Sequence, residues 1–210
     1  MTGKEIIEVR SIIRDISLRL AQDEFESYEE TNSEIAPTNS APVITSNGTD
    51  LAFEYAQFGF EKWDGKGVII NARAETAHEK SMFKKHITSG RCVIPTSGYF
   101  EWKPPNEGQK KKIKHHIKDK QGNLLFMAGL WREGNNGREF VIITKPPFGE
   151  IATIHDRMPV LLRVDQLESW LSGVMPIDSL SLLDFACVGE PYTEHQLFKE
   201  DNANEQMSLF

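Results

Sequence analysis

The chain has 210 residues, a net charge of −7 and a hydrophobic content of 39% with twelve Phe and four Trp, which suits one globular domain with a substantial core. No apolar run approaches the length of a membrane span, and charges recur through residues 4–23, where a signal peptide would carry a continuous apolar segment. The two cysteines, Cys92 and Cys187, have neither metal-ligand spacing nor a disulfide framework, so we expect a reduced, cytoplasmic protein without a metal or cofactor.

The first predicted element is an amphipathic helix over residues 4–22. Its apolar residues recur at spacings of three and four positions, at Ile6, Val9, Ile13, Ile16 and Leu20. An acidic, turn-rich stretch follows through residue 31. From Ile35 the pattern changes to short apolar runs separated by Gly, Pro and Asn, which is typical of strands.

These short runs predict strands at Pro42–Ile44, Leu51–Phe60, Gly67–Ile70, Arg91–Pro95, Ile113–Ile117, Leu124–Leu130 and Glu139–Thr144. Asn47-Gly48 and Gln121-Gly122 are typical of hairpin turns. Helices are expected at His78–His86, Gly149–Thr153 and Asp165–Ser172. The order of elements predicts an α+β fold, a single domain over residues 1–190 with a curved, largely antiparallel sheet flanked by helices. Residues 191–210 are expected to form an acidic tail.

Charge is distributed unevenly along the chain. Residues 21–35 carry a local charge of −6 and residues 181–210 one of −5, whereas residues 81–120 carry +7. A negative net charge is therefore compatible with a positively charged face. A phosphate backbone is attracted to such a local face. The run Lys110–Lys114 is either part of such a face or a solvated hairpin tip.

Three short runs place polar groups beside apolar residues that can hold them rigidly: Asn71–Thr76, Ser97–Trp102 and Ile154–Pro159. Together they supply an amide, a carboxylate and an imidazole, which is the set that general acid–base chemistry needs. The remaining histidines show no HExxH-type arrangement, so no metal site is expected.

The three runs resemble the SRAP family (SOS response-associated peptidase), whose members bind single-stranded DNA and cross-link abasic sites. The resemblance covers roughly residues 34–162 and is carried by Arg91–Pro95 leading into Gly98–Trp102 and by Ile154–Pro159, with Glu34–Thr38 as a weaker landmark. Family members carry a cysteine directly after the initiator methionine, which they remove autocatalytically. The freed amine attacks the aldehyde of an open abasic sugar, and the thiol then closes a thiazolidine ring.

The resemblance implies roles for individual residues. Asn71 would orient the N-terminal residue and the sugar, Glu101 would shuttle protons, and His155 would protonate the ring-opened sugar oxygen or stabilise the adduct. Arg73 and Arg157 would hold phosphates, and Met82 and Trp63 would pack on splayed bases. Imine formation near neutral pH needs one proton added and one removed, so a buried Glu and a His suit it independently of the resemblance.

Each of these residues also has a plainer interpretation. Asn71 can cap a turn, Glu101 can face solvent on a strand whose alternation points it away from Phe100 and Trp102, and His155 with Asp156 can cap a helix. The two arginines can be structural ion-pair partners, and Met82 and Trp63 can be core residues. These alternatives stay open at the level of sequence.

The start of the chain departs from the family pattern, because Thr2 stands where the family has cysteine. One explanation is an upstream start that supplies the missing strand and cysteine. The other is that Thr2 is the true second residue, whose amine can form an imine but closes an oxazolidine less favourably. Rival functions are a non-covalent sensor of abasic or single-stranded DNA and a peptidase with Thr2 as nucleophile.

The chain ends in an apolar motif on an otherwise acidic tail. Its last residues resemble the motif that binds the bacterial sliding clamp, with Gln206 on the pocket rim and Leu209 and Phe210 in the pocket. The alternative is that the tail folds back on its own domain. Partners are thus expected to be abasic single-stranded DNA and the clamp, with a location at replication forks; no membrane partner is expected, and a monomer is the default state.

Overall fold

The computed structural model describes residues 34–47, 51–105, 110–182 and 187–192. The predicted helix over residues 4–22, Thr2 and the clamp-like motif at Gln206, Leu209 and Phe210 lie outside this part of the chain. None of the helices within the described ranges is long and apolar enough to cross a membrane.

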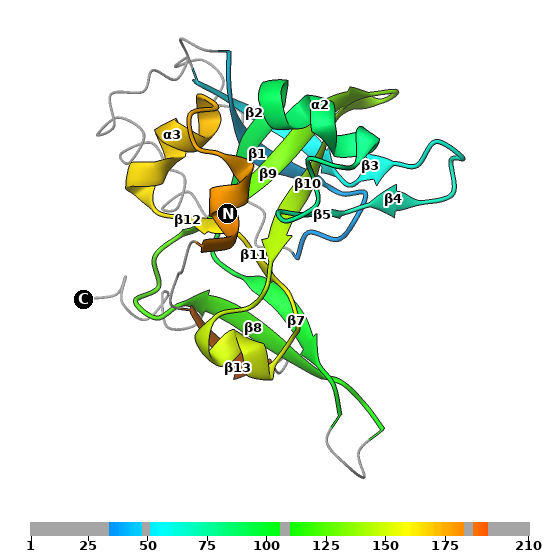
Figure 1. Ribbon diagram of the computed structural model, residues 1–210. Coiled ribbons are helices and arrows are strands. Elements are labelled where there is room, and N and C mark those ends of the chain that lie inside the picture. Colours follow the sequence, from blue (N-terminus) through cyan, green and yellow to red (C-terminus); the bar gives the residue numbers. More distant parts are fainter. Residues whose placement is uncertain (1–33, 48–50, 106–109, 183–186, 193–210) are drawn as a thin grey trace, which may run out of the picture.

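The described strands form one large sheet that closes on itself. Its order is β11-β10-β2-β1-β6-β9-β12, and β10 also pairs with β9, so that β10, β2, β1, β6 and β9 make a ring (Figure 1). Among these strands the pairings of β10 with β2 and with β5 are parallel and the others antiparallel. The bounds are β1 Ser40–Ser46, β2 Leu51–Phe58, β5 Asn71–Arg73, β6 Arg91–Thr96, β9 Leu125–Gly134, β10 Gly137–Lys145, β11 Met158–Pro159 and β12 Leu161–Leu162.

Two smaller sheets complete the β structure. The three-stranded sheet has the order β13-β8-β7, and β3 pairs with β4 in a short hairpin. In Figure 1 the three-stranded sheet lies below the large sheet, and the β7–β8 hairpin projects away from the body of the molecule. The bounds are β3 Phe60–Glu61, β4 Val68–Ile69, β7 Tyr99–Lys103, β8 Ile113–Asp119 and β13 Cys187–Pro191.

Two apolar clusters stabilise the fold on opposite faces of the strands. On β6, Val93 belongs to the first cluster, and Cys92 and Ile94 belong to the second, as alternation along a strand requires. The first cluster includes Phe83 and Trp170 and is therefore the face that the helices cover. The helical elements are α2 Ser81–Ser89, α3 Leu167–Leu171 and the 3₁₀ turns η2 Gly149–Thr153, η3 Val164–Gln166 and η4 Ile177–Leu182.

The second cluster joins the large sheet to the small one. It contains Met127 of β9, Ile117 of β8, Cys187 of β13, Ile151 of η2 and Ile154, the first residue of the third sequence run. Burying these side chains together fixes η2 and the segment after it against both sheets, because close-packed interiors leave little freedom to their members. Glu101 and His155 lie at this junction.

The predicted α+β class, with a curved and mostly antiparallel sheet, is confirmed. Several details differ from the sequence prediction, among them strands β5, β7 and β13, which the sequence did not predict. The predicted strand Leu51–Phe60 is interrupted at Gly59, which has a φ of 113°. This residue separates the end of β2 from the start of β3. The turn at Gln121-Gly122 exists, with the amide of Gly122 donating to the carbonyl of Asp119, but β8 and β9 belong to different sheets, so it is not a hairpin turn.

Candidate functional site

Glu101 occupies the centre of β7. Phe100 and Trp102 lie on one face of this strand, where both rings are approached by the ammonium of Lys114, at 4.0 and 5.6 Å from the ring centroids. Alternation therefore turns Glu101 to the other face, as the sequence predicted. It does not face open solvent there, because its side chain is only 23% exposed and lies against His155.

His155 is positioned by the turn that precedes it. Its backbone amide donates to the carbonyl of Ile151 at 3.0 Å, and the neighbouring Ile154 is buried in the second apolar cluster. Ile154 packs against β13 at Gly189, where a side chain would meet the Ile154 Cδ1 atom at 2.2 Å. The imidazole is thus carried by an anchored segment and not by a helix cap.

The two groups form a pair at the junction of the sheets. His155 Nε2 lies 3.7 Å from Glu101 Oε2, which is within ion-pair range. Burial raises the pKa of the Glu101 carboxyl above its ordinary value, and the positive charge that His155 can carry opposes that shift. A carboxylate with a raised pKa beside an imidazole is an arrangement suited to proton transfer.

The other imidazole nitrogen has partners for both protonation states. Nδ1 lies 3.1 Å from the amide nitrogen of Arg157, which donates to it when Nδ1 is bare, leaving the ring proton on Nε2 toward Glu101. When Nδ1 is protonated, it faces the carbonyl oxygen of Arg157 and the carboxylate of Asp156, each at 3.2 Å. Nδ1 thus has a hydrogen-bond partner in either state, but its protonation takes the acceptor away from the Arg157 amide.

Arg157 is held in a bidentate ion pair. Its Nη1 and Nη2 atoms each lie 2.9 Å from an oxygen of Glu75, and Nη2 also donates to the carbonyl of Thr144 at 2.7 Å. The hydrogen bond from Arg157 holds the pKa of the Glu75 carboxyl below its ordinary value. The structure thus realises the ion-pair alternative for Arg157, and the sequence reading did not identify Glu75 as its partner.

Asn71 and Arg73 lie on β5, next to the same part of β10. They pair in parallel register with Ile142 and Thr144, and both side chains are exposed. The carbonyl of Thr144 accepts from the amide of Ala74 as well as from Arg157, so β5 and the His155 segment converge on one residue. The first and third sequence runs are thereby brought together; the expected roles of Asn71 and Arg73 stay predictions.

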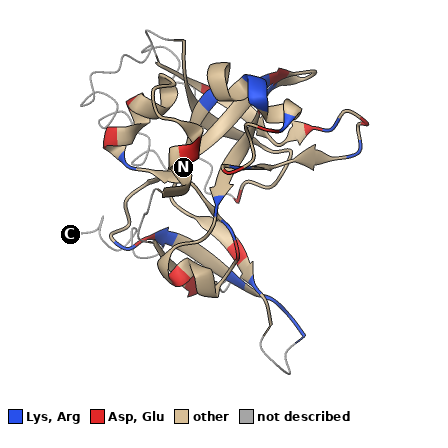
Figure 2. Ribbon diagram, in the orientation of Figure 1, with Lys and Arg blue, Asp and Glu red and all other residues tan. Residues whose placement is uncertain are grey.

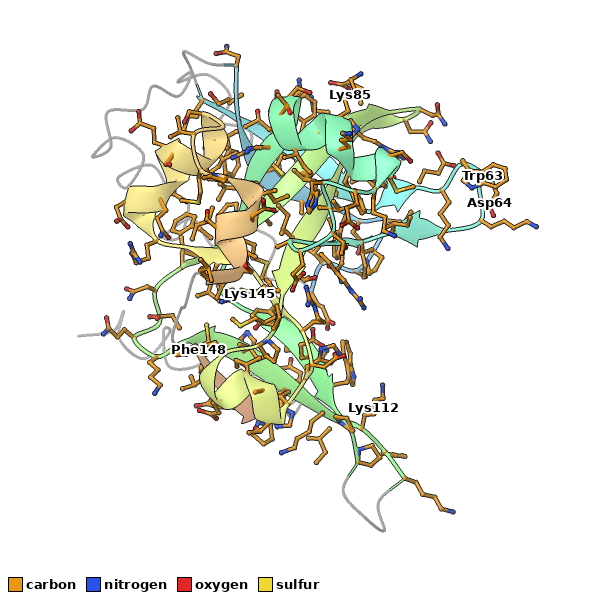
Figure 3. All side chains as sticks on the ribbon, viewed as in Figure 1. Trp63, Asp64, Lys85, Lys112, Lys145 and Phe148 are labelled. Atoms are coloured by element: carbon orange, nitrogen blue, oxygen red, sulfur yellow. The ribbon has the colours of Figure 1, made fainter. Side chains whose placement is uncertain are left out.

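Trp63 and Met82 lie in a different place. Both line an open cleft of about 470 Å³ between the β3–β4 hairpin and the β9–β10 turn, and Glu101 and His155 take no part in its walls. Met82 is half-buried and packs on the first apolar cluster, whereas Trp63 is 94% exposed at the hairpin tip (Figure 3). Met82 is thus partly a core residue, while Trp63 is not one.

Neither cysteine is placed for nucleophilic chemistry. Cys92 is fully buried in β6, and burial raises the pKa of its thiol strongly. Burial also raises the pKa of Cys187 to about 12, so both thiols stay protonated at neutral pH. Within the described ranges no three His, Cys, Asp or Glu residues gather in a way that would hold a metal ion.

Comparison with known proteins places this arrangement in a family. The family model described as SOS response associated peptidase (SRAP) matches residues 3–197. The chain belongs to the SRAP family. The match includes all three polar runs and begins at the residue that directly follows Thr2.

Curated relatives carry one shared description. The chain is 37% identical over 150 residues to the abasic site processing protein YoqW of Bacillus subtilis (strain 168), covering 66% of this chain and 65% of that protein. It is 30% identical over 142 residues to the abasic site processing protein YedK of Escherichia coli (strain K12), covering 65% and 63%. The chain thus spans slightly less than two thirds of the length of these two relatives.

Solved structures agree on the fold. A crystal structure of a protein from Bacteroides thetaiotaomicron has a TM-score of 0.64 at 27% identity, covering 77% of each chain. A phage-related protein from Bordetella bronchiseptica has a TM-score of 0.65 at 22% identity, covering 81% of this chain and 87% of that one. The SRAP-like architecture is therefore shared over most of the chain.

Proposed function

We propose that the chain recognises abasic sites in single-stranded DNA and reacts with them through the amine of its N-terminal residue. The observation that carries this proposal is the partly buried Glu101 paired with His155 in a chain whose curated relatives are named abasic site processing proteins. Imine formation between an amine and an aldehyde expels water, so it needs a proton acceptor and a proton donor close together. Glu101 and His155 fit these two roles.

Residues outside the pair suit substrate binding. Asn71 offers an amide to the sugar and Arg73 a guanidinium to a flanking phosphate, since both side chains are exposed on β5. Arg157 serves chiefly as a positioning residue, because its guanidinium is engaged by Glu75 while its backbone amide holds His155. Trp63 and Met82 line a cleft in which a splayed base can stack.

Where Thr2 is the N-terminal residue, its side chain decides which product forms. After removal of Met1, the α-amine of Thr2 can condense with the aldehyde, but its hydroxyl closes an oxazolidine less favourably than a thiol closes a thiazolidine. We therefore expect a reversible imine, or strand cleavage by β-elimination, and no durable cross-link. Autocatalytic removal of Met1 by the same pair of proton-transferring groups is part of the proposal.

A non-covalent sensor is the second candidate, and the threonine at position 2 is the observation that favours it. Such a protein would bind abasic DNA with Asn71, Arg73 and Trp63 and would form no imine. A peptidase that uses Thr2 as nucleophile is the third, and turnover of a peptide without DNA would select it.

We also propose that the C-terminal motif tethers the protein to the bacterial sliding clamp. Leu209 and Phe210 end an acidic, Asn-rich tail that gains nothing from apolar residues unless a partner binds them. Deletion of residues 206–210 should abolish clamp binding and leave DNA binding intact. An unchanged clamp affinity would remove this part of the proposal.

The proposed reaction is tested with an oligonucleotide that carries one abasic site. The purified chain is incubated with it, half of each sample is reduced with borohydride, and SDS-resistant adducts are resolved; an oligonucleotide with a tetrahydrofuran site, which lacks the aldehyde, is the control. We expect adducts only with the aldehyde and only after reduction, and durable adducts without reduction for Thr2→Cys. Binding without any trapped adduct would select the sensor, and absence of binding would overturn the proposal.

A further inference from the structure

The β7–β8 hairpin carries a dense group of lysines away from the body of the molecule. Lys110, Lys111 and Lys112 are exposed on one arm, and Lys103 is half-buried on the other (Figures 1 and 2). The described parts of the two arms beyond Glu101, residues 102–105 and 110–114, contain no acidic residue. The described arms of the hairpin therefore form a projecting strip of positive charge on a chain whose total charge is −7.

These lysines differ from the lysines farther along the same strand. Lys114 is paired with Glu34, and Lys118 lies 3.2 Å from a carboxylate oxygen of Glu190. Within the described ranges none of Lys103, Lys110, Lys111 and Lys112 has a carboxylate within 4.0 Å. Their charges are thus available to an external anion, whereas the charges nearer the sheet are already neutralised.

The strip is continuous with the candidate site. Glu101 lies on the same strand as Lys103, with one residue between them, and its neighbour across the sheet is His115 on the lysine-bearing strand. Lys112 is close enough that its positive charge helps to lower the pKa of the Glu101 carboxyl against the effect of burial. Figure 3 labels Lys112 on the hairpin below the junction of the two sheets.

We propose that the β7–β8 hairpin is a phosphate-binding arm, which holds the DNA backbone on one side of the abasic nucleotide while Glu101 and His155 act on the sugar. Four lysines on a projecting ribbon match the repeating charge of a nucleic-acid strand better than a compact anion. Lysine ammonium groups contact phosphates without reading bases, so the arm adds affinity and not sequence preference. This inference rests on the proposed function and names the path of the strand that the site would bind.

The test compares two pairs of substitutions at the two ends of β8. Lys110→Gln/Lys111→Gln removes two charges from the arm, and Lys118→Gln/Lys120→Gln removes the same number from the opposite end of β8. Affinity for a tetrahydrofuran-containing oligonucleotide is measured over a range of salt concentrations. Three oligonucleotides are used, with flanking nucleotides on both sides of the site, only on the 5′ side, or only on the 3′ side.

We expect the arm variant to make the slope of log affinity against log salt less negative by about 1.4, since each phosphate contact on a single strand contributes about −0.7. The effect should persist with only one of the two one-sided oligonucleotides, and the control variant should leave the slope unchanged. Equal effects of both variants, or an unchanged slope in the arm variant while the wild-type chain binds normally, would overturn the proposal of a phosphate-binding arm. The proposed function would be unaffected by either result. Failure of the wild-type chain to bind would overturn the proposed function and this inference together.

Discussion

Glu101 holds its carboxylate where desolvation disfavours the charge. The side chain is 23% exposed, and the His155 charge only partly opposes the burial that raises its pKa. A group whose pKa is higher in the folded than in the unfolded chain binds more protons when folded, so its contribution to stability falls as pH rises through the interval between the two values. The residue is therefore expected to cost stability at neutral pH.

Glu101→Gln should raise the midpoint of thermal unfolding at pH 7 and abolish imine trapping with abasic DNA. The gain should shrink as pH falls through the interval between the folded and unfolded pKa values, and it should be gone below the ordinary range of a glutamate, where the wild-type carboxyl is protonated in both states. Thermal unfolding at several pH values measures it. Glu168→Gln, on α3 and away from the site, is the control, and a lower midpoint for Glu101→Gln at pH 7 would contradict the argument.

Glu75 should show the opposite pH dependence. Its pKa is lowered in the folded chain by the hydrogen bond from Arg157, so it stabilises the fold above the pKa of the unfolded carboxyl and loses that effect as pH falls through the folded value. Glu75→Gln should therefore unfold more easily than wild type at pH 7, with the difference vanishing in acid. Its rate of imine trapping should also fall, because Arg157 carries the amide that orients His155. A pH-independent difference in stability would refute the assignment.

At the scale of the element, local patterns were predictable and pairings between distant segments were not. The runs around Glu101 and His155 singled out two residues that the structure places 3.7 Å apart, because polar groups next to apolar residues are recognisable without a fold. The ion pair of Arg157 with Glu75 depends on β5 meeting a segment 82 residues away. Strand β13 was missed because Gly189 and Pro191 are typical of turns, and here pairing with β8 overrides that preference.

Gly189 is where β13 supports the site. A methyl group there would lie 2.2 Å from Ile154 Cδ1, so Gly189→Ala should displace Ile154, lower the free energy of unfolding by about 1–3 kcal/mol and slow imine trapping through His155. Ile154→Val removes the clashing atom, and the double variant should recover most of both losses. Denaturant unfolding and imine-trapping rates are measured for the wild type, the two single variants and the double variant, which form a double-mutant cycle. Additive effects of the two substitutions would show that the contact between residues 189 and 154 does not matter.

At the scale of the whole molecule, the two apolar clusters have different structural roles. The first packs the helices on the large sheet and contains Trp170, whose indole nitrogen donates to the carbonyl of Cys92 at 2.9 Å. The second joins the large sheet to the small sheet that carries Glu101. A loss of packing in the first cluster should thus affect stability alone, whereas a loss in the second should also change the relative position of Glu101 and His155.

Ile143→Val and Ile154→Val test this division with the same chemical change. Ile143 is buried in the first cluster and Ile154 in the second, so each substitution should lower the free energy of unfolding by about 0.5–1.5 kcal/mol. Only Ile154→Val should slow imine trapping under conditions where both variants are fully folded, because only Ile154 adjoins the imidazole. Circular dichroism establishes the folded fraction, and single-turnover trapping gives the rate. Equal slowing in both variants would mean that the site responds to the stability of the whole domain and not to the packing at the junction of its sheets.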